Sequence, residues 1–250
     1  MRDVSSRISW IFFLLVGVTV AGGVLTTLGT SVAITAGVVL LVLGGWAVSL
    51  CLHEFGHAFV AYRNGDASVR DKGYLTLDIR RYTDPVFSFV LPLIFLIAGG
   101  IPLPGGAVWI NQWAIRSKTA RSLVSLAGPL MNLLLGILLT VTVALVPMPV
   151  GLLIGLSCLA FIQVLAFVLN ILPVPGLDGF GVLEPYLSEP TRAFADKVRP
   201  WAPLVLFLLI IGLPGVSRLF FDVGGVIFEL IGGDADAAFA GYDELLFWRR

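Results

Sequence analysis

The feature that most constrains this chain is the length of its uncharged runs. Residues 8–52 contain no aspartate, glutamate, lysine or arginine, and neither do residues 85–115, 122–177 and 200–217. A helix needs only about 20 apolar residues to cross a bilayer, so the first and third runs can each hold two helices. Strands of a membrane barrel would instead alternate apolar and polar residues over about ten positions. The runs therefore predict an all-α polytopic membrane protein.

The overall composition agrees with a membrane location and gives no reason to expect a nucleic-acid partner. The mean hydropathy is +0.97, and 13% of the residues are charged. The net charge is zero, so the chain has no excess of positive charge with which to attract a nucleic acid. Cys51 and Cys158 both lie in apolar runs, which indicates small buried hydrophobic side chains rather than a disulfide framework.

The order of apolar and polar segments predicts one membrane-embedded domain over residues 1–250, built as a bundle of about six transmembrane helices. An N-terminal span is expected over 8–28, and a second span over about 32–62 ends where charged and glycine residues begin. Further spans are expected over 122–146, 150–172, 200–216 and 219–232. The last of these is either a short sixth span or a helix that lies in the membrane interface.

A polar segment follows the second span and contains a candidate β-strand. Residues 73–79 alternate apolar and polar side chains, a pattern typical of a short strand. The strand can be interpreted as one arm of a surface β-hairpin. It can also be interpreted as an edge strand that pairs with an extended peptide substrate. In the second interpretation, Tyr74 and Thr76 are candidate substrate-binding residues.

The end of the second span carries the only two histidines of the chain, within the sequence His-Glu-Phe-Gly-His at residues 53–57. Residues four positions apart lie on one face of a helix, so the imidazoles of His53 and His57 share that face. This spacing suits two ligands of one tetrahedral zinc ion, with Glu54 placed to accept a proton from water. The sequence therefore predicts a zinc site at the end of this span.

The third zinc ligand has to come from elsewhere, because a catalytic zinc takes three protein ligands and the chain has no third histidine. Cys51 precedes His53 by two residues and lies on another face of the helix. The carboxylates considered are Asp66, Asp71, Asp78, Asp84, Asp178 and Glu184. Asp178 alone follows a long uncharged run and sits among turn-forming prolines and glycines. A carboxylate at membrane depth is energetically costly, so its presence indicates a function. Asp178 is the predicted third ligand, with a solvated loop aspartate as the alternative.

Bringing Asp178 to His57 constrains the path of the chain between them. The predicted helical hairpin over 122–172 leaves one side of the membrane and returns to it, so its two ends share that side. Residues 84–110 therefore cannot make a net crossing, and the prolines and glycines at 102–106 prevent a regular helix. We expect this segment to be re-entrant, or to lie along the surface, and to shape a water-filled cavity.

The distribution of lysine and arginine predicts the orientation in the membrane. Arg2 and Arg7 precede the first span, and basic residues recur over 63–81 and 116–121. The turns expected after the first span and at 147–149 have none. Because cytosolic loops are enriched in lysine and arginine, the N-terminus and the predicted zinc site are expected on the cytosolic side. The small size and the lack of a disulfide-bearing external domain favour a prokaryotic cell membrane.

Two further motifs accompany the histidine pair. Residues 170–179 read Asn-x-x-Pro-x-Pro-x-Leu-Asp-Gly, and residues 127–132 read Ala-Gly-Pro-x-x-Asn. Together with the sequence at 53–57, these motifs resemble those of the site-2 protease family of intramembrane zinc metalloproteases, in its compact form without a PDZ or CBS domain. The resemblance places the catalytic core at about residues 32–180.

The resemblance implies one zinc ion held by His53, His57 and Asp178, with Glu54 as the general base. It also implies cleavage of membrane-spanning protein or peptide substrates within or near the lipid bilayer. Asn132 and Asn170 are candidate hydrogen-bond partners of the substrate, with helix–helix contact as the alternative for both. Two rival functions are a catalytically silent membrane scaffold and a transporter of metal ions or protons, although no paired inverted halves are visible in the sequence.

Overall fold

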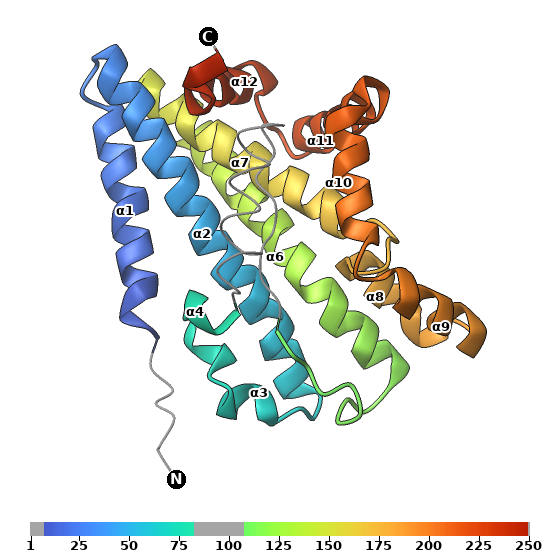
Figure 1. Cartoon of the computed structure of the whole chain (residues 1–250). Helices are drawn as coiled ribbons and strands as arrows, with labels where there is room; N and C mark the ends of the chain where they lie inside the picture. The colour runs from blue at the N-terminus through green and yellow to red at the C-terminus, as the bar shows by residue number, and fades with distance from the viewer. Residues whose placement is uncertain (1–7, 83–107, 250) are drawn as a thin grey trace.

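The computed structural model of the chain describes residues 8–82 and 108–249. Within these residues the regular elements are all helices (Figure 1). The bundle is built on α2 (Ser31–Arg63), α6 (Lys118–Leu145) and α7 (Val150–Asn170), and α1 (Trp10–Thr26) packs on its outer side against α2. The prediction of an all-α chain is confirmed for the described part.

Within residues 8–82 and 108–249, fewer than six helices are long and apolar enough to cross a membrane. By length and composition, α2, α6 and α7 are each able to cross a membrane, and α1 is a shorter apolar helix of 17 residues. The count rises to four if two helices near the C-terminus, over 202–212 and 214–230, are taken together as one further span that is sharply bent. The predicted number of about six transmembrane helices is therefore not confirmed.

Helices α1 and α2 pack closely because glycines line their contact. A β-carbon added to Gly22 of α1 would lie 2.3 Å from the backbone nitrogen of Leu41 in α2. One added to Gly37 of α2 would lie 2.6 Å from the backbone nitrogen of Thr26. Small residues of this kind let helix backbones approach each other within membranes. The contact holds α1 against α2, the helix that carries the histidines.

The segment between α2 and α6 departs from the sequence prediction. In place of a strand over 73–79, it folds into three short helical turns, α3 (Ser68–Asp71), η1 (Tyr74–Thr76) and α4 (Ile79–Tyr82). Gly73 and Leu77 both adopt left-handed backbone conformations, with φ of 76° and 56°. An extended strand requires negative φ throughout, so these two residues interrupt it. The prediction of a β-hairpin or edge strand is wrong.

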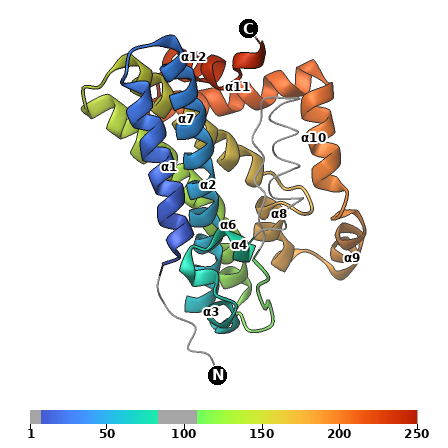
Figure 2. The ribbon, with the colours of Figure 1, turned by 60° about the vertical axis from the view of Figure 1, so that its left-hand side comes forward.

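The C-terminal third of the chain returns from the zinc-motif end of the bundle to its opposite end. Its elements are α8 (Asp178–Leu183), η3 (Glu184–Tyr186), α9 (Glu189–Val198), α10 (Ala202–Gly212), α11 (Pro214–Leu230), α12 (Ala235–Leu245) and η4 (Phe247–Arg249). Helix α11 lies across the end of the bundle, as Figure 2 shows. Helices α10 and α11 meet at a bend of 98°.

The bend changes the prediction for the last two spans. Helix α10 has 11 residues, which at 1.5 Å per residue gives about 16 Å, roughly half of a bilayer core. Pro214 begins α11 at a position where a helix tolerates proline. The expected spans over 200–216 and 219–232 are thus replaced by one short helix and one that turns sharply away from it. The predicted re-entrant segment over 84–110 falls outside the described residues except for 108–110.

Candidate metal centre

The two histidines lie on the last turns of α2 and are buried inside the bundle, although they are polar. Their rings lie 4.8 Å apart, centroid to centroid, in an edge-to-face arrangement. The Nε2 atoms of His53 and His57 are separated by 3.1 Å. Their spacing of four residues therefore brings the two Nε2 atoms next to each other, as the helical repeat predicts.

The opposite ring nitrogens hold this orientation. The Nδ1 atom of His53 lies 2.6 Å from Oδ1 of Asn132, and Nδ1 of His57 lies 2.7 Å from the backbone oxygen of Val124. Each Nδ1 faces an oxygen, so it carries the proton and leaves Nε2 with a free lone pair. Both imidazoles are thereby presented as acceptors, which is the form that binds a metal ion.

The motif at 127–132 is the part of α6 that packs on the histidines. A β-carbon added to Gly128 would lie 2.2 Å from Nε2 of His57 and 2.6 Å from Nε2 of His53. On the other helix, a β-carbon added to Gly56 would lie 3.0 Å from the backbone oxygen of Ala127. Distances this short leave no room for a side chain at either glycine. The two glycines let α2 and α6 approach, and Asn132, one turn further along α6, reaches His53.

Asp178 is the first residue of α8 and completes the cluster. Its Oδ2 lies 3.2 Å from Nε2 of His53, and its Oδ1 lies 3.3 Å from Nε2 of His57. The fold therefore closes the long separation in sequence between Asp178 and the histidines.

The backbone on either side of Asp178 depends on two glycines. Gly176 has a φ of 100°, which L-residues with a side chain rarely adopt. A β-carbon added to Gly179 would lie 2.0 Å from the backbone oxygen of Ile171. A hydrogen bond of 2.7 Å from Oγ of Ser122 in α6 to the backbone oxygen of Val182 ties α8 to the bundle. The turn and this tie together fix where Asp178 stands.

Glu54 lies beside the cluster but does not belong to it. The cluster of ligand atoms within 4.8 Å of one another comprises His53, His57 and Asp178. Glu54 is buried, a backbone hydrogen bond from Val108 reaches its carboxylate, and its Oε2 has no partner among the described residues. A buried carboxylate oxygen without a partner next to three metal-ligating groups is suited to accept a proton.

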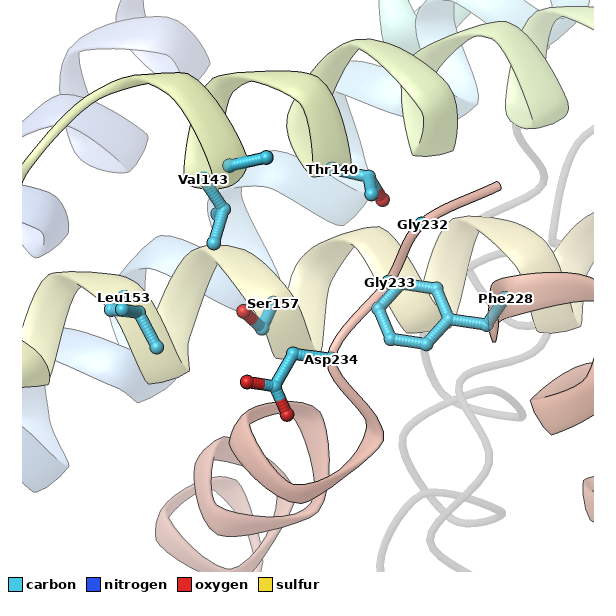
Figure 3. A pocket seen from close by; sticks show the side chains of 9 residues that line it. Thr140, Val143, Leu153, Ser157, Phe228, Gly232, Gly233 and Asp234 are labelled. Carbon is cyan, nitrogen blue, oxygen red and sulfur yellow. The ribbon is translucent and has the colours of Figure 1, made fainter. Parts of the chain in front are cut away.

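All four side chains border one cavity of about 600 Å³. Its walls come from the ends of α2 and α7, from residues 108–112, from α6, and from α8 and the start of α10. The lining also includes Asn170, Glu184, Arg199 and Phe207. A second cavity of about 290 Å³ lies between α6, α7, α11 and α12 and is lined by Thr140, Ser157 and Asp234 among others (Figure 3). No residue of the metal cluster lines the second cavity.

The four predicted substrate-binding residues lie in different places. Asn170 lines the cavity, and its Nδ2 has no partner among the described residues. Asn132 has both polar atoms engaged, one by His53 and one by Gln163. Tyr74 is buried away from the cavity, and its backbone oxygen accepts a hydrogen bond from the hydroxyl of Tyr82. The hydroxyl of Thr76 donates a hydrogen bond to the backbone oxygen of Gly73. Because Tyr74 and Thr76 lie in a helical turn, they offer no edge strand with which an extended substrate could pair.

Three of the rival carboxylates have other partners, and Asp84 lies outside the described residues. Asp66 accepts hydrogen bonds from Ser68 and from the backbone nitrogen of Asn111. Asp78 pairs with Arg80, and the hydrogen bond from Arg80 lowers the pKa of Asp78. Glu184 lies in the cavity but pairs with Arg199. Each of these acids has a structural role, whereas Asp178 has the two histidines as neighbours.

Three contributors to the site were missed by the sequence reasoning. Arg199 and Phe207 reach the cavity from distant parts of the chain, and no local pattern marks them. Gln163 carries a signal that could have been used, because an amide within the apolar helix α7 is costly in a membrane unless it has a partner. Its Oε1 accepts a hydrogen bond of 2.9 Å from Nδ2 of Asn132.

The donor set of the cluster fits zinc. Two neutral imidazole nitrogens and one carboxylate are the ligands of several catalytic zinc sites. The three groups converge without a hydrogen-bond donor between them, so a cation at their centre would relieve the repulsion of their lone pairs.

Comparisons with known proteins agree with this assignment. Peptidase family M50 matches residues 38–153 of the chain. The Mycobacterium tuberculosis protein named "Putative zinc metalloprotease Rip2" is 45% identical over 249 residues, which cover 98% of this chain and 95% of that protein. Its namesake from Mycolicibacterium smegmatis is 41% identical over the same shares. YwhC of Bacillus subtilis, also named as a zinc metalloprotease, is 30% identical over 66% of this chain and 77% of its own length.

No solved structure matches the chain. The likeness to the mycobacterial proteins runs over nearly the full length of both partners, and so includes the region around Asp178 that lies beyond the family match. On this basis the chain belongs to peptidase family M50, the site-2 protease family of zinc metalloproteases.

Proposed function

We propose that this chain binds one zinc ion through His53, His57 and Asp178 and uses Glu54 to cleave peptide bonds of membrane-spanning substrates. The observation that carries the proposal is the convergence of three ligand atoms within 4.8 Å beside a buried carboxylate oxygen without a partner. The three proposed ligands and the proposed proton acceptor, Glu54, thus line the same cavity but occupy different places in it.

A bound zinc ion supplies Lewis-acid chemistry, polarising a carbonyl group and making water more acidic. Glu54 accepts the proton of the attacking water and returns it to the leaving amine. A general base of this kind contributes about 10²- to 10⁴-fold to the rate.

Asn170 is the proposed hydrogen-bond donor to the substrate. Its side chain is buried at the end of α7, lines the cavity and has an amide nitrogen without a partner among the described residues. A buried donor that finds no partner in the protein is suited to a partner supplied by the substrate. Asn132 lacks this property, since both of its polar atoms are already engaged.

We also propose that the site faces the cytosol of a prokaryotic cell. The turns at 27–30 and 146–149 lie at one end of the bundle, and residues 63–82, with α3 and α4, lie at the other (Figure 1). The basic residues over 63–81 and 116–121 gather at the second end. The distribution of charge and the positive-inside rule support a cytosolic assignment of that end.

Metal removal tests the proposed function. We expect the purified protein, reconstituted in a bilayer with a single-span substrate, to lose cleavage on treatment with a zinc chelator and to recover it when zinc is restored. Cleavage products identified by mass spectrometry should map within or next to the apolar span of the substrate. Cleavage that is unaffected by chelation would contradict the zinc assignment. Zinc binding without any cleavage would favour the scaffold or transporter functions instead.

A further inference from the structure

Three buried amide and imidazole groups form a chain that leads away from the proposed metal centre. Nδ1 of His53 lies 2.6 Å from Oδ1 of Asn132. Nδ2 of Asn132 donates to Oε1 of Gln163 at 2.9 Å. The three side chains come from α2, α6 and α7, and each is at most 5% exposed. Gln163 thus touches the centre only through Asn132.

The middle member of this chain can be turned two ways. An asparagine amide presents an oxygen on one side and an NH₂ group on the other, and exchanging them reverses its hydrogen bonding. With the oxygen toward His53, Nδ1 of the imidazole carries the proton and Nε2 is free to bind a metal ion. With the NH₂ group toward His53, Nδ1 would have to accept, the proton would move to Nε2, and the ligand atom would be blocked.

The other histidine has no such ambiguity. Nδ1 of His57 faces the backbone oxygen of Val124 at 2.7 Å, and a carbonyl in a helix cannot exchange its oxygen for a donor. The orientation of His57 is set by the fold itself. The orientation of His53 is set by a side chain that needs a further contact to decide which way it faces.

Gln163 supplies that contact and leaves part of its own hydrogen bonding unmet. Its Oε1 meets the NH₂ group of Asn132, but its Nε2 is buried and has no partner within residues 8–82 and 108–249. Buried polar groups normally find partners, and Gln163 borders a cavity of about 180 Å³ whose other lining residues are mostly apolar. The hydrogen bond with Asn132 is the one polar contact of this side chain that the described residues provide.

We propose that Gln163 is a positioning residue for the metal centre. It fixes the Asn132 amide with its oxygen toward His53, and thereby holds His53 in the tautomer that presents Nε2 to the metal. The proposal rests on the proposed function in one respect, the assignment of His53 as a metal ligand.

The test uses full-length protein in detergent or nanodiscs and measures the zinc dissociation constant by competition with a chelator. Gln163→Met removes the acceptor at similar length, and Gln163→Leu removes it with a different shape. Both should weaken zinc binding by about 10- to 100-fold, the usual effect of losing a residue that orients a ligand. The absorption spectrum of the cobalt-loaded protein should change in both variants, because the geometry at His53 is altered.

The decisive variant is Asn132→Asp. A carboxylate presents an oxygen to His53 whichever way it turns, so it needs no partner to orient it. We expect zinc binding in the Asn132→Asp background to be insensitive to Gln163→Met. The matched control is Thr140→Val. It removes a buried hydroxyl that, like the Gln163 amide nitrogen, has no partner among the described residues, but that lies outside the chain of contacts. This variant should leave zinc affinity unchanged.

Two results would overturn the proposal. One is wild-type zinc affinity in both Gln163→Met and Gln163→Leu. The other is a loss of affinity of the same size in the Asn132→Asp background, which would assign Gln163 to packing alone. Failure of the metal assignment on which the proposal rests looks different, because the wild-type protein itself would then bind no zinc, and a protein that binds zinc without cleaving would leave this test unaffected.

Discussion

Glu54→Gln is expected to abolish cleavage while zinc remains bound. Glu54 lies in the cavity next to the cluster but is not one of its three ligand groups. The substitution keeps the size of the side chain and removes its ability to accept a proton. Since general-base catalysis contributes about 10²- to 10⁴-fold, the rate constant for cleavage of a single-span substrate should fall by about that factor. Metal analysis should still find one zinc per chain.

The matched control is Glu184→Gln, which changes a carboxylate of the same cavity in the same way. Glu184 pairs with Arg199 rather than with the cluster. We expect this variant to keep its zinc and to retain most of its activity, because a partly exposed ion pair contributes little. Equal cleavage by Glu54→Gln and the wild type would remove Glu54 from the mechanism.

Gly128→Ala is expected to destroy metal binding through a single methyl group. The added carbon would lie 2.2 Å from Nε2 of His57 and 2.6 Å from Nε2 of His53, so it would displace the atoms that hold the ion. Alanine favours a helix more than glycine does, so α6 itself should not be weakened. We expect zinc affinity to fall by at least about 100-fold, the upper end of the effect seen when ligand orientation is lost, and cleavage to be lost with it.

Gly225→Ala provides the control for this prediction. Gly225 also lies in an apolar helix, α11, and a β-carbon there would meet no atom within 4 Å. The control should bind zinc and cleave substrate as the wild type does. Both quantities can be measured on the same preparations, by metal analysis and by the substrate assay. Tight zinc binding by Gly128→Ala would show that α6 does not press on the histidines.

The parts of the site that the sequence predicted are those controlled by local geometry. His53 and His57 share a face because the helical repeat requires it, and the long uncharged runs define α2, α6 and α7. The meeting of Asp178 with the histidines is not local. It followed from excluding other ligands and from the hairpin of α6 and α7, which brings the two ends of one uncharged run to the same side.

The parts that could not be predicted depend on backbone conformation or on distant contacts. The alternation over 73–79 suggested a strand, but Gly73 and Leu77 adopt left-handed conformations that side-chain pattern does not reveal. Hydropathy is likewise insensitive to the bend between α10 and α11. Asn132 was considered as a substrate ligand, because the sequence does not show that Gln163 and His53 occupy both ends of its amide.

X-ray absorption at the zinc edge, recorded on the purified wild-type protein, tests the central assignment most directly. The cluster of His53, His57 and Asp178 predicts only nitrogen and oxygen neighbours of the zinc, at about 2.0–2.2 Å, with the multiple scattering that imidazole rings produce. Asp178→Ala should lose one oxygen neighbour or the metal altogether. A sulfur neighbour at about 2.3 Å, or a wild-type protein that holds no zinc, would contradict the account.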